Sequence, residues 1–292
     1  MPDSAHRLIV CACLLFAACA SQTFVPDAAI RCEQCDDWNE PQSPFRVFGN
    51  TWYVGTAGLS SVLIDSGDGL ILIDAGLPQS ARQIVDNIRT LGFDPRDIRS
   101  ILVSHAHFDH VGGIAALQRQ SGASVTASRD AARVLLEGTS FEDDPQFGPD
   151  LPSFPPVERV SSSVDEVSLG LGSASLRGLP TPGHTPGGMT WTWQECEHDR
   201  CLDIVYADSL SPVSRPGYRF SDGMGDRIRQ SASLIAALNC DIFLSTHDFS
   251  FGLHEKLALG RDAFIDPDGC KSYAARALQR LEQRLERELE EP

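Results

Sequence analysis

Short runs of apolar and β-branched residues alternate with polar turns along most of the chain. Such runs are typical of β-strands, whereas apolar positions three or four residues apart are typical of helices. The pattern predicts strands within 46–55, 60–66, 70–76, 100–107 and 124–128, and a helix over 112–122. A second series follows, with strands within 164–170, 173–181, 187–193, 202–208 and 241–246, and a helix over 226–239. Two such halves predict an α/β fold in which helices cover both faces of a central pair of sheets.

Two further segments complete this pattern. Residues 271–289 place apolar side chains on one helical face, at Tyr273, Ala277, Leu281, Leu285 and Leu289. This spacing predicts an amphipathic helix that packs on the core. Residues 137–158 are rich in Pro, Gly and acidic residues. They predict a long irregular loop, which is either a lid or binding loop or a surface excursion.

The composition is that of a globular protein. The chain has 292 residues, of which 42% are hydrophobic and 22% charged. We expect a single domain over residues 21–292. The formal net charge of −16 disfavours a nucleic-acid partner, because non-specific binding to phosphates requires basic patches. A small-molecule substrate fits this charge better.

The first 20 residues have the layout of a secretory signal peptide. Arg7 precedes an apolar run over 8–18, and small residues lead to a cleavage position after Ala20. The run is too short for a stable membrane span. We therefore expect a soluble protein in the periplasm or outside the cell. Cys19 lies in a weak lipoprotein box, so a lipid-anchored form is the alternative.

Export favours disulfide bonds among the six cysteines that follow residue 20. Two strand-like runs joined by a polar turn carry Cys196 and Cys201, which predicts a bridge across a hairpin. Cys240 and Cys270 would then tie a strand to the last helix. The C-x-x-C at 32–35 lies in a polar segment without a βαβ pattern, which indicates a local bridge or free thiols.

The segment ILVSHAHFDHVGG, residues 101–113, contains four metal-binding side chains within six positions. His105 and His107 follow a buried strand and project to the same side if the chain stays extended. Asp109 and His110 follow in the turn, before two glycines open a helix. Nitrogen and oxygen donors clustered at a strand end can surround a metal ion. The alternative is a set of neighbouring surface or capping residues.

Two further histidines lie at comparable positions. His184 occurs in the Pro/Gly-rich turn LPTPGHTPGG after a strand, and His247 lies just past the strand DIFLST. With the first cluster they make five histidines and one aspartate, enough for two adjacent metals with a position left for water. No role is assigned to His6, His198 or His254.

These motifs, in this order, resemble the metallo-β-lactamase superfamily. The resemblance rests on HAHFDH, the upstream LILIDAG, the later TPGHTPGG and ADS, and the final strand-end histidine, and it spans about Asp37 to Cys270. DDWNEPQSPFRVFGNTWYVGT, TPGHTPGGMTWTW, YADSLS and the Cys240/Cys270 pair are similar to the third subclass of metallo-β-lactamases. The resemblance implies an αββα sandwich with two central mixed sheets and a metal site at one edge of both sheets.

The resemblance also implies a role for each site residue. It assigns a first zinc to His105, His107 and His184, and a second zinc to Asp109, His110 and His247. It implies that Asp109 is also catalytic, because it positions the attacking water.

Four residues outside the ligand set also receive expectations. The resemblance implies that Ser209 and Ser211 bind the substrate carboxylate; alternatively, they are polar residues at a strand end. It implies that Asp74 orients the metal site. Asp208 is ambiguous, because some hydrolases of the superfamily use an aspartate in this region to bridge the metals.

The implied reaction is hydrolysis of the β-lactam amide bond in penicillins, cephalosporins or carbapenems, which confers antibiotic resistance. Zinc lowers the pKa of a bound water towards about 7, so hydroxide can attack at neutral pH. The chain contains neither S-x-x-K nor G-x-S-x-G, the motifs of serine enzymes. We expect a monomer. The alternatives are an exported thioesterase or lactonase of the same superfamily, or a zinc-binding protein without turnover.

Overall fold

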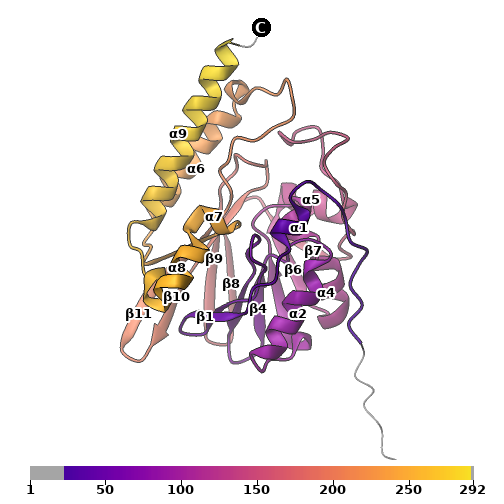
Figure 1. Cartoon of the computed structure of the whole chain (residues 1–292), viewed down its shortest axis with the longest axis vertical. Coiled ribbons are helices and arrows are strands. Elements are labelled where there is room, and N and C mark those ends of the chain that lie inside the picture. The colour runs from indigo at the N-terminus through magenta and orange to yellow at the C-terminus, as the bar shows by residue number, and fades with distance from the viewer. Residues whose placement is uncertain (1–22, 291–292) are drawn as a thin grey trace, which may run out of the picture.

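The computed structural model describes residues 23–290, so the predicted signal peptide lies outside the described part (Figure 1). Two sheets lie face to face in the middle of the molecule. The larger has seven strands in the order β1-β2-β3-β4-β5-β6-β7, and the smaller has five in the order β12-β11-β10-β9-β8. Both sheets are mixed: β4 to β7 pair in parallel after an antiparallel start, and β11 pairs in parallel with β12 only. The two mixed sheets expected from the sequence are confirmed.

All strands except β7, which lies outside the predicted strand segments, fall close to the predicted positions. Those of the larger sheet are β1 (Phe45–Phe48), β2 (Thr51–Tyr53), β3 (Val62–Asp65), β4 (Leu70–Ile73), β5 (Ile98–Leu102), β6 (Ser124–Ser128) and β7 (Val160–Ser163). Those of the smaller sheet are β8 (Val167–Leu171), β9 (Ala174–Pro180), β10 (Met189–Glu197), β11 (Arg200–Ala207) and β12 (Ile242–Ser245). The segment 46–55 forms a hairpin of two strands, because Gly49 takes a left-handed φ of 52° and reverses the chain.

Helices cover the outer face of each sheet (Figure 1). The helices α2 (Ser80–Thr90), α4 (Ile114–Ser121) and α5 (Arg129–Glu137) lie beside the larger sheet, and α6 (Met224–Ala236) and α9 (Gly269–Glu290) lie beside the smaller one. Shorter turns of helix are α1 (Cys35–Trp38), α3 (Phe108–Val111), α7 (Asp248–Phe251), α8 (Leu253–Leu259), η1 (Pro95–Asp97), η2 (Phe220–Asp222) and η3 (Arg261–Phe264). The αββα arrangement is therefore confirmed.

Alternation along the central strands separates two hydrophobic cores. In β4, Leu70 and Leu72 pack with α2 and α4, whereas Ile71 and Ile73 face the smaller sheet. All four side chains are at most 2% exposed. Successive side chains of a strand point to opposite faces, so a strand buried on both faces reads as a continuous apolar run. This explains why LILI is apolar throughout.

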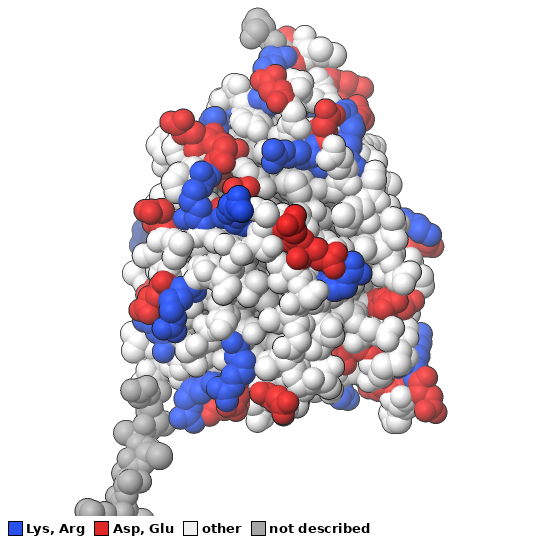
Figure 2. Space-filling model, turned by 180° about the vertical axis from the view of Figure 1, so that it is seen from behind, with Lys and Arg blue, Asp and Glu red and all other residues white. Residues whose placement is uncertain are grey.

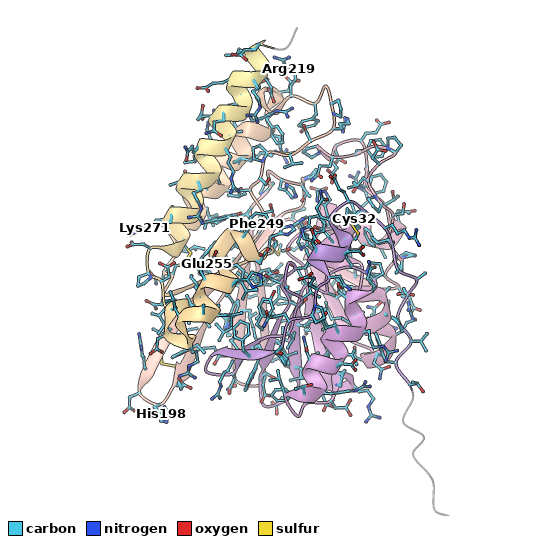
Figure 3. All side chains as sticks on the ribbon, in the orientation of Figure 1. Cys32, His198, Arg219, Phe249, Glu255 and Lys271 are labelled. Atoms are coloured by element: carbon cyan, nitrogen blue, oxygen red, sulfur yellow. A yellow bond between two sulfur atoms is a disulfide. The ribbon has the colours of Figure 1, made fainter. Side chains whose placement is uncertain are left out.

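Three disulfide bonds join the six described cysteines. Cys196 and Cys201 lie directly opposite each other in the β10–β11 hairpin, whose turn contains His198 (Figure 3). The second bond links Cys240, just before β12, to Cys270 in α9. Both predicted pairings are confirmed. The C-x-x-C at 32–35 forms the local bridge, which was one of the two alternatives.

Charged side chains of both signs are interspersed on the face seen in Figure 2. Exposed ion pairs on the molecular surface include Arg177 with Glu166 and Arg229 with Glu282. Such pairs contribute little to stability because solvent screens them. Among residues 23–290, no helix combines the length and apolar character needed to cross a membrane.

A buried carboxylate fixes the end of α9. The two carboxylate oxygens of Glu288 accept hydrogen bonds from the backbone N–H groups of Phe220, at 2.8 Å, and Ser221, at 3.1 Å. Arg284, one turn earlier, donates to the same carboxylate at 3.0 Å. Burial opposes ionisation of Glu288, but these donors outweigh it and hold the pKa of Glu288 below its ordinary value. Glu288 therefore joins α9 to η2, which leads into α6.

We predict that Glu288→Ala lowers the free energy of unfolding by about 2 kcal/mol, because two backbone donors lose their acceptor. A group with a lowered folded-state pKa stabilises the fold above its unfolded value, and this contribution is lost as the pH falls through the folded value. The difference between wild type and variant should therefore be full above the ordinary pKa of 4.5 and shrink below it. Urea unfolding at several pH values measures it. Glu286→Ala, an exposed change on the same helix, is the matched control.

Candidate metal centre

Strand ends from both sheets carry the candidate residues to one edge of the sandwich. His105 follows β5 of the larger sheet, whereas His184 follows β9 and His247 follows β12 of the smaller sheet. Asp109 and His110 lie in the helical turn α3, whereas the sequence predicted a simple turn. His107, which has an extended backbone, is the residue directly before this helical turn.

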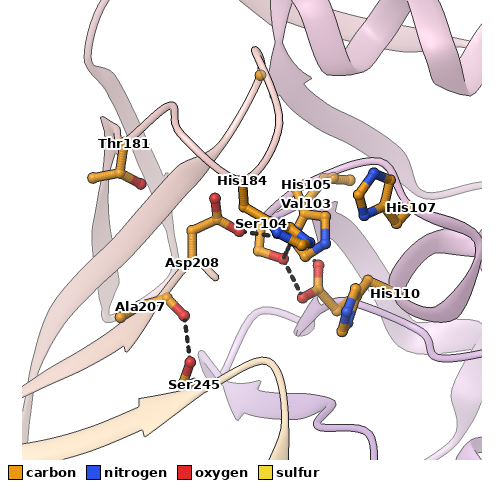
Figure 4. A network of polar contacts seen from close by, with 12 residues as sticks. Val103, Ser104, His105, His107, His110, Thr181, His184, Ala207, Asp208 and Ser245 are labelled. Atoms are coloured by element: carbon orange, nitrogen blue, oxygen red, sulfur yellow. Dashed lines mark hydrogen bonds and ion pairs between the residues drawn. The ribbon is translucent and has the colours of Figure 1, made fainter. Parts of the chain in front are cut away.

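The six predicted ligands form two groups. His105, His107 and His184 make the first donor group, and Asp109, His110 and His247 make the second. Within each group the donor atoms all lie within 4.8 Å of one another, a spacing at which a single ion could contact them. Figure 4 shows His105, His107, His110 and His184 gathered at the ends of strands. The structure thus brings together every residue of the predicted ligand set.

Asp74 links the two sheets beneath these groups. Its carboxylate accepts hydrogen bonds from the backbone N–H of Ser104, at 2.9 Å, and from the Ser104 hydroxyl, at 2.6 Å. Tyr206 of β11 donates its hydroxyl to the same carboxylate at 2.9 Å. Asp74 is fully buried, and burial raises its pKa to about 6 despite these donors. Its φ of 57° is unusual for a non-glycine residue and belongs to the kind of strain found at functional sites.

Each histidine of the first donor group has its outer ring nitrogen held. His105 Nδ1 lies 2.7 Å from Asp208 Oδ1, as Figure 4 shows. His184 Nδ1 lies 2.8 Å from the backbone oxygen of Ser211, which accepts its proton. Such bonds fix the tautomer and the ring orientation of a metal-binding histidine and leave the other nitrogen free. Asp208, left ambiguous by the sequence, contacts His105 in this way.

The third histidine depends on a residue that the sequence analysis missed. His107 Nε2 lies 2.9 Å from Asp144 Oδ2, and Asp144 is buried. Asp144 belongs to the acidic loop 137–158, where the sequence offers Glu142, Asp143 and Asp144 in a row. Nothing in their spacing distinguishes the one that turns inward. In the same loop, the Gln146 amide nitrogen lies 3.5 Å from His107 Nδ1 and 3.4 Å from His184 Nε2.

Two glycine positions allow this packing. A Cβ at Gly188 would lie 2.1 Å from Asp208 Oδ2 and 2.5 Å from the backbone oxygen of Thr181. A Cβ at Gly113 would lie 2.4 Å from the backbone oxygen of Ala75, which follows Asp74. The glycines in TPGHTPGG and in HVGG are therefore required by close approach of neighbouring chain segments.

The second donor group is packed beneath aromatic rings. His110 Nε2 lies 3.1 Å and His247 Nε2 lies 3.5 Å from Asp109 Oδ2. The Trp38 ring centroid lies 5.3 Å from that of His247, and the Phe249 ring stacks on His247 at 5.1 Å. The N-terminal segment thereby covers one side of this group.

Burial favours the neutral form of three of the five histidines in the donor groups. It lowers the pKa of His184 to about 4 and that of His247 to about 3, with neighbouring histidines adding to the effect. It also lowers the pKa of His105 well below its ordinary value. Burial likewise disfavours protonated His110, but the Asp109 carboxylate outweighs it and raises the pKa of His110. Neutral imidazole is the form that ligates a metal, so most of the cluster is already in the binding form.

Buried ring nitrogens of His105, His110 and His247 also lack a hydrogen-bond partner among residues 23–290. His105 Nε2 faces the first donor group and makes no hydrogen bond with residues 23–290. A buried polar atom without a partner costs free energy, which a bound cation would recover. Imidazoles with one carboxylate are the donors that zinc and similar transition metals prefer. The residues therefore fit a metal centre.

A cavity of about 530 Å³ opens over both donor groups. It lies in the size range of small-molecule sites. Ser209 and Ser211 line it together with His107, Asp109, His184 and His247. Cys32 and Phe249 also line it, and Figure 3 shows both near the upper ends of the sheets. The wall thus combines candidate ligands, hydroxyl groups and apolar side chains.

Comparison with known proteins identifies the family. The family model described as "Metallo-beta-lactamase superfamily" matches residues 55–232, more than half of the chain. The chain belongs to the metallo-beta-lactamase superfamily. The matched region includes five of the six candidate ligands, and His247 lies beyond it.

Solved structures of this superfamily are similar over almost the whole chain. The structure titled Rm3 metallo-beta-lactamase is 46% identical, with a TM-score of 0.85, covering 89% of this chain and 99% of that one. MEM-A1, described as a subclass B3 metallo-beta-lactamase from a soil metagenome library, is 45% identical, with a TM-score of 0.84. That likeness covers 88% of this chain and 100% of MEM-A1.

Curated relatives match a smaller part of the molecule. A hydroxyacylglutathione hydrolase of Anaeromyxobacter dehalogenans (strain 2CP-C) is 32% identical over 146 residues, which covers 50% of this chain and 42% of that protein. The chain spans about half the length of the curated relatives that it matches. Each of these matches covers about half of this chain.

We predict that Gly188→Ala weakens metal binding at the first donor group by about 10- to 100-fold, the range for losing an outer hydrogen-bond partner. The added Cβ would displace Asp208 from His105. Competition with a chromophoric chelator measures the affinity. Gly170→Ala, where a Cβ meets nothing within 4 Å, is the control and should bind metal as the wild type does. Equal affinities in both variants would contradict the role given to Gly188.

Proposed function

We propose that this protein is an exported, monomeric zinc β-lactamase that hydrolyses the amide bond of β-lactam antibiotics and confers resistance to them. The observation that carries the proposal is the 46% identity to Rm3 metallo-beta-lactamase over 99% of that chain. The hydroxyacylglutathione hydrolase of Anaeromyxobacter dehalogenans and the N-acyl homoserine lactonase of Bacillus sp match over only 42% and 54% of their length. The three disulfides fit an oxidising compartment such as the periplasm.

In this proposal the two donor groups hold two zinc ions, with His105, His107 and His184 at the first and Asp109, His110 and His247 at the second. When bound, zinc supplies Lewis-acid chemistry: it lowers the pKa of water towards about 7 and polarises a carbonyl oxygen. A protein nucleophile is not needed for such chemistry.

The remaining roles belong to side chains around the cavity. Asp109 is the catalytic carboxylate: it orients the attacking water and accepts a hydrogen bond from it. Ser209 and Ser211 donate hydroxyl hydrogen bonds to the substrate carboxylate, since both line the cavity beside the donor groups. Apolar groups that line the cavity, among them Trp38 and Phe249, exclude water from one side of a bound substrate.

A thioesterase or lactonase activity is the second candidate. It is favoured by the hydroxyacylglutathione hydrolase and by the N-acyl homoserine lactonase of Bacillus sp, which is 27% identical over 150 residues. The same donor groups could serve either reaction, because a thioester, a lactone and a lactam all present a carbonyl carbon to attack. The wall of the cavity decides between them.

We predict that the purified protein, residues 21–292 loaded with zinc, hydrolyses a chromogenic cephalosporin and a carbapenem. A chelator should abolish turnover, and added zinc should restore it. Absorbance of the opened lactam measures the rate. Hydrolysis of an S-acylglutathione or an acyl homoserine lactone in place of both lactams would favour the second candidate. Absence of all turnover despite bound zinc would indicate a binding protein.

We predict that His184→Ala reduces the zinc content to about half that of the wild type, since the first group keeps only two ligands. Turnover should fall at least about a hundredfold, because several kcal/mol of transition-state stabilisation are lost. Elemental analysis and the lactam assay measure the two effects. His198→Asn, in the β10–β11 turn with a φ of 56°, is the control, because asparagine tolerates this backbone. Full zinc content and activity in His184→Ala would refute the ligand assignment.

A further inference from the structure

One short segment of chain holds two of the three histidines of the first donor group. The segment runs from Asp208 to Arg215, directly after β11. Asp208 holds His105 through its carboxylate, and the backbone oxygen of Ser211 holds His184. The third histidine, His107, is held by Asp144, which belongs to the separate loop 137–158. A contact between this loop and the segment 208–215 would couple the orientation of all three histidine rings to that segment.

Arg215 provides that link. Its guanidinium Nη1 donates to the backbone oxygen of Asp144 at 2.8 Å, and its own backbone N–H donates to the oxygen of Pro145 at 2.9 Å. The guanidinium carbon lies 6.0 Å from the Phe147 ring centroid and 5.3 Å from that of Tyr218. Two hydrogen bonds and the contact with the Phe147 ring thus hold the Asp144 segment against the Arg215 segment, whereas the Tyr218 contact lies within the Arg215 segment itself.

Asp144 depends on such a hold because its loop has little other structure. No helix or strand occurs from Gly138 to Arg159. Within the loop, the backbone of Asp144 makes two short turn hydrogen bonds, from Asp144 N–H to the oxygen of Phe141 and from Phe147 N–H to that of Asp144. The carboxylate itself is committed to His107 and to the backbone N–H of Gln146, at 2.8 Å. Its direction therefore follows the position of its backbone, which Arg215 contacts.

We propose that Arg215 is a positioning residue for the first metal: it holds Asp144 so that the carboxylate orients His107. Through Arg215, the segment 208–215 orients all three histidines of the first donor group. The same segment lines the cavity with Ser209 and Ser211, so the wall that meets the substrate also supports the first metal's ligands. This inference rests on the proposed metal binding and deepens it.

The structure offers a matched control in the same loop. Arg133 forms an ion pair with Asp143, at 2.7 Å, and lies 4.1 Å over the Phe141 ring. It therefore clamps the residues just before Asp144 with the same kinds of contact, but it makes no hydrogen bond with Asp144 itself. A general loosening of the loop should affect both arginine variants, whereas loss of the path through Asp144 should affect only Arg215.

The experiment measures stepwise zinc affinity by competition with a chromophoric chelator. It uses wild-type protein and the variants Asp144→Asn, Arg215→Ala, Arg215→Lys and Arg133→Ala. Asp144→Asn should weaken the first site by about 10- to 100-fold, and Arg215→Ala by less, about three- to tenfold, because it acts indirectly. Arg215→Lys keeps one donor but not the planar stacking, so its affinity should lie between those of the wild type and Arg215→Ala.

A second readout separates positioning from folding. The visible absorption of the cobalt(II)-loaded protein reports the geometry around the first metal, and it should change in Arg215→Ala but not in Arg133→Ala. In the Asp144→Asn background, Arg215→Ala should weaken zinc binding little further, because a residue that acts through Asp144 has nothing left to position. Thermal unfolding of the metal-free variants checks that each is folded. Arg215→Lys provides the comparison if Arg215→Ala does not fold.

The outcomes distinguish the two proposals. If wild-type protein binds no zinc, the proposed function fails and this inference falls with it. If wild-type protein binds two zinc ions and Arg215→Ala matches it in both affinity and cobalt spectrum, only the inference is overturned. Equal weakening in Arg215→Ala and Arg133→Ala, or additive effects of Arg215→Ala and Asp144→Asn, would also overturn it.

Discussion

The structure around the site depends on one buried carboxylate, that of Asp74. It is fully buried and is hydrogen-bonded by Ser104, which precedes the first histidine, and by Tyr206 of the opposite sheet. An ionised group without partners in such a place would be very costly, so the ends of β4, β5 and β11 must stay where they satisfy it. This requirement fixes the edge of the sandwich from which the donor groups project.

A second requirement of the site is that its buried imidazoles are neutral and that each ring points the correct nitrogen toward the metal position. Burial favours neutral rings, but it does not choose the nitrogen that faces a metal. Carboxylates and carbonyl oxygens make that choice by binding the outer nitrogens of His105, His107 and His184. Rigid strands place the rings, and the loops after β11 and α5 orient them. Loops therefore contribute to the precision of the centre as well as to the cavity wall.

The comparisons with known proteins differ in how much of the chain they cover. The curated hydrolases cover about half of this chain. The likeness to Rm3 and MEM-A1 extends over almost the whole chain. A shared core can serve different carbonyl substrates, so the choice of substrate resides in the wall.

The sequence by itself determined all strands except β7 and a pair of sheets covered by helices on both faces, because these follow from local periodicity. It also determined the six candidate ligands, because they lie in short motifs at strand ends. It also indicated the bridges of Cys196 with Cys201 and of Cys240 with Cys270. Only the tertiary structure decided that Asp144 is the carboxylate on His107, since the adjacent Asp143 has the same side chain but turns outward to Arg133. The Arg215 contact was equally hidden, because 71 residues separate it from Asp144 and no sequence pattern records which loops meet.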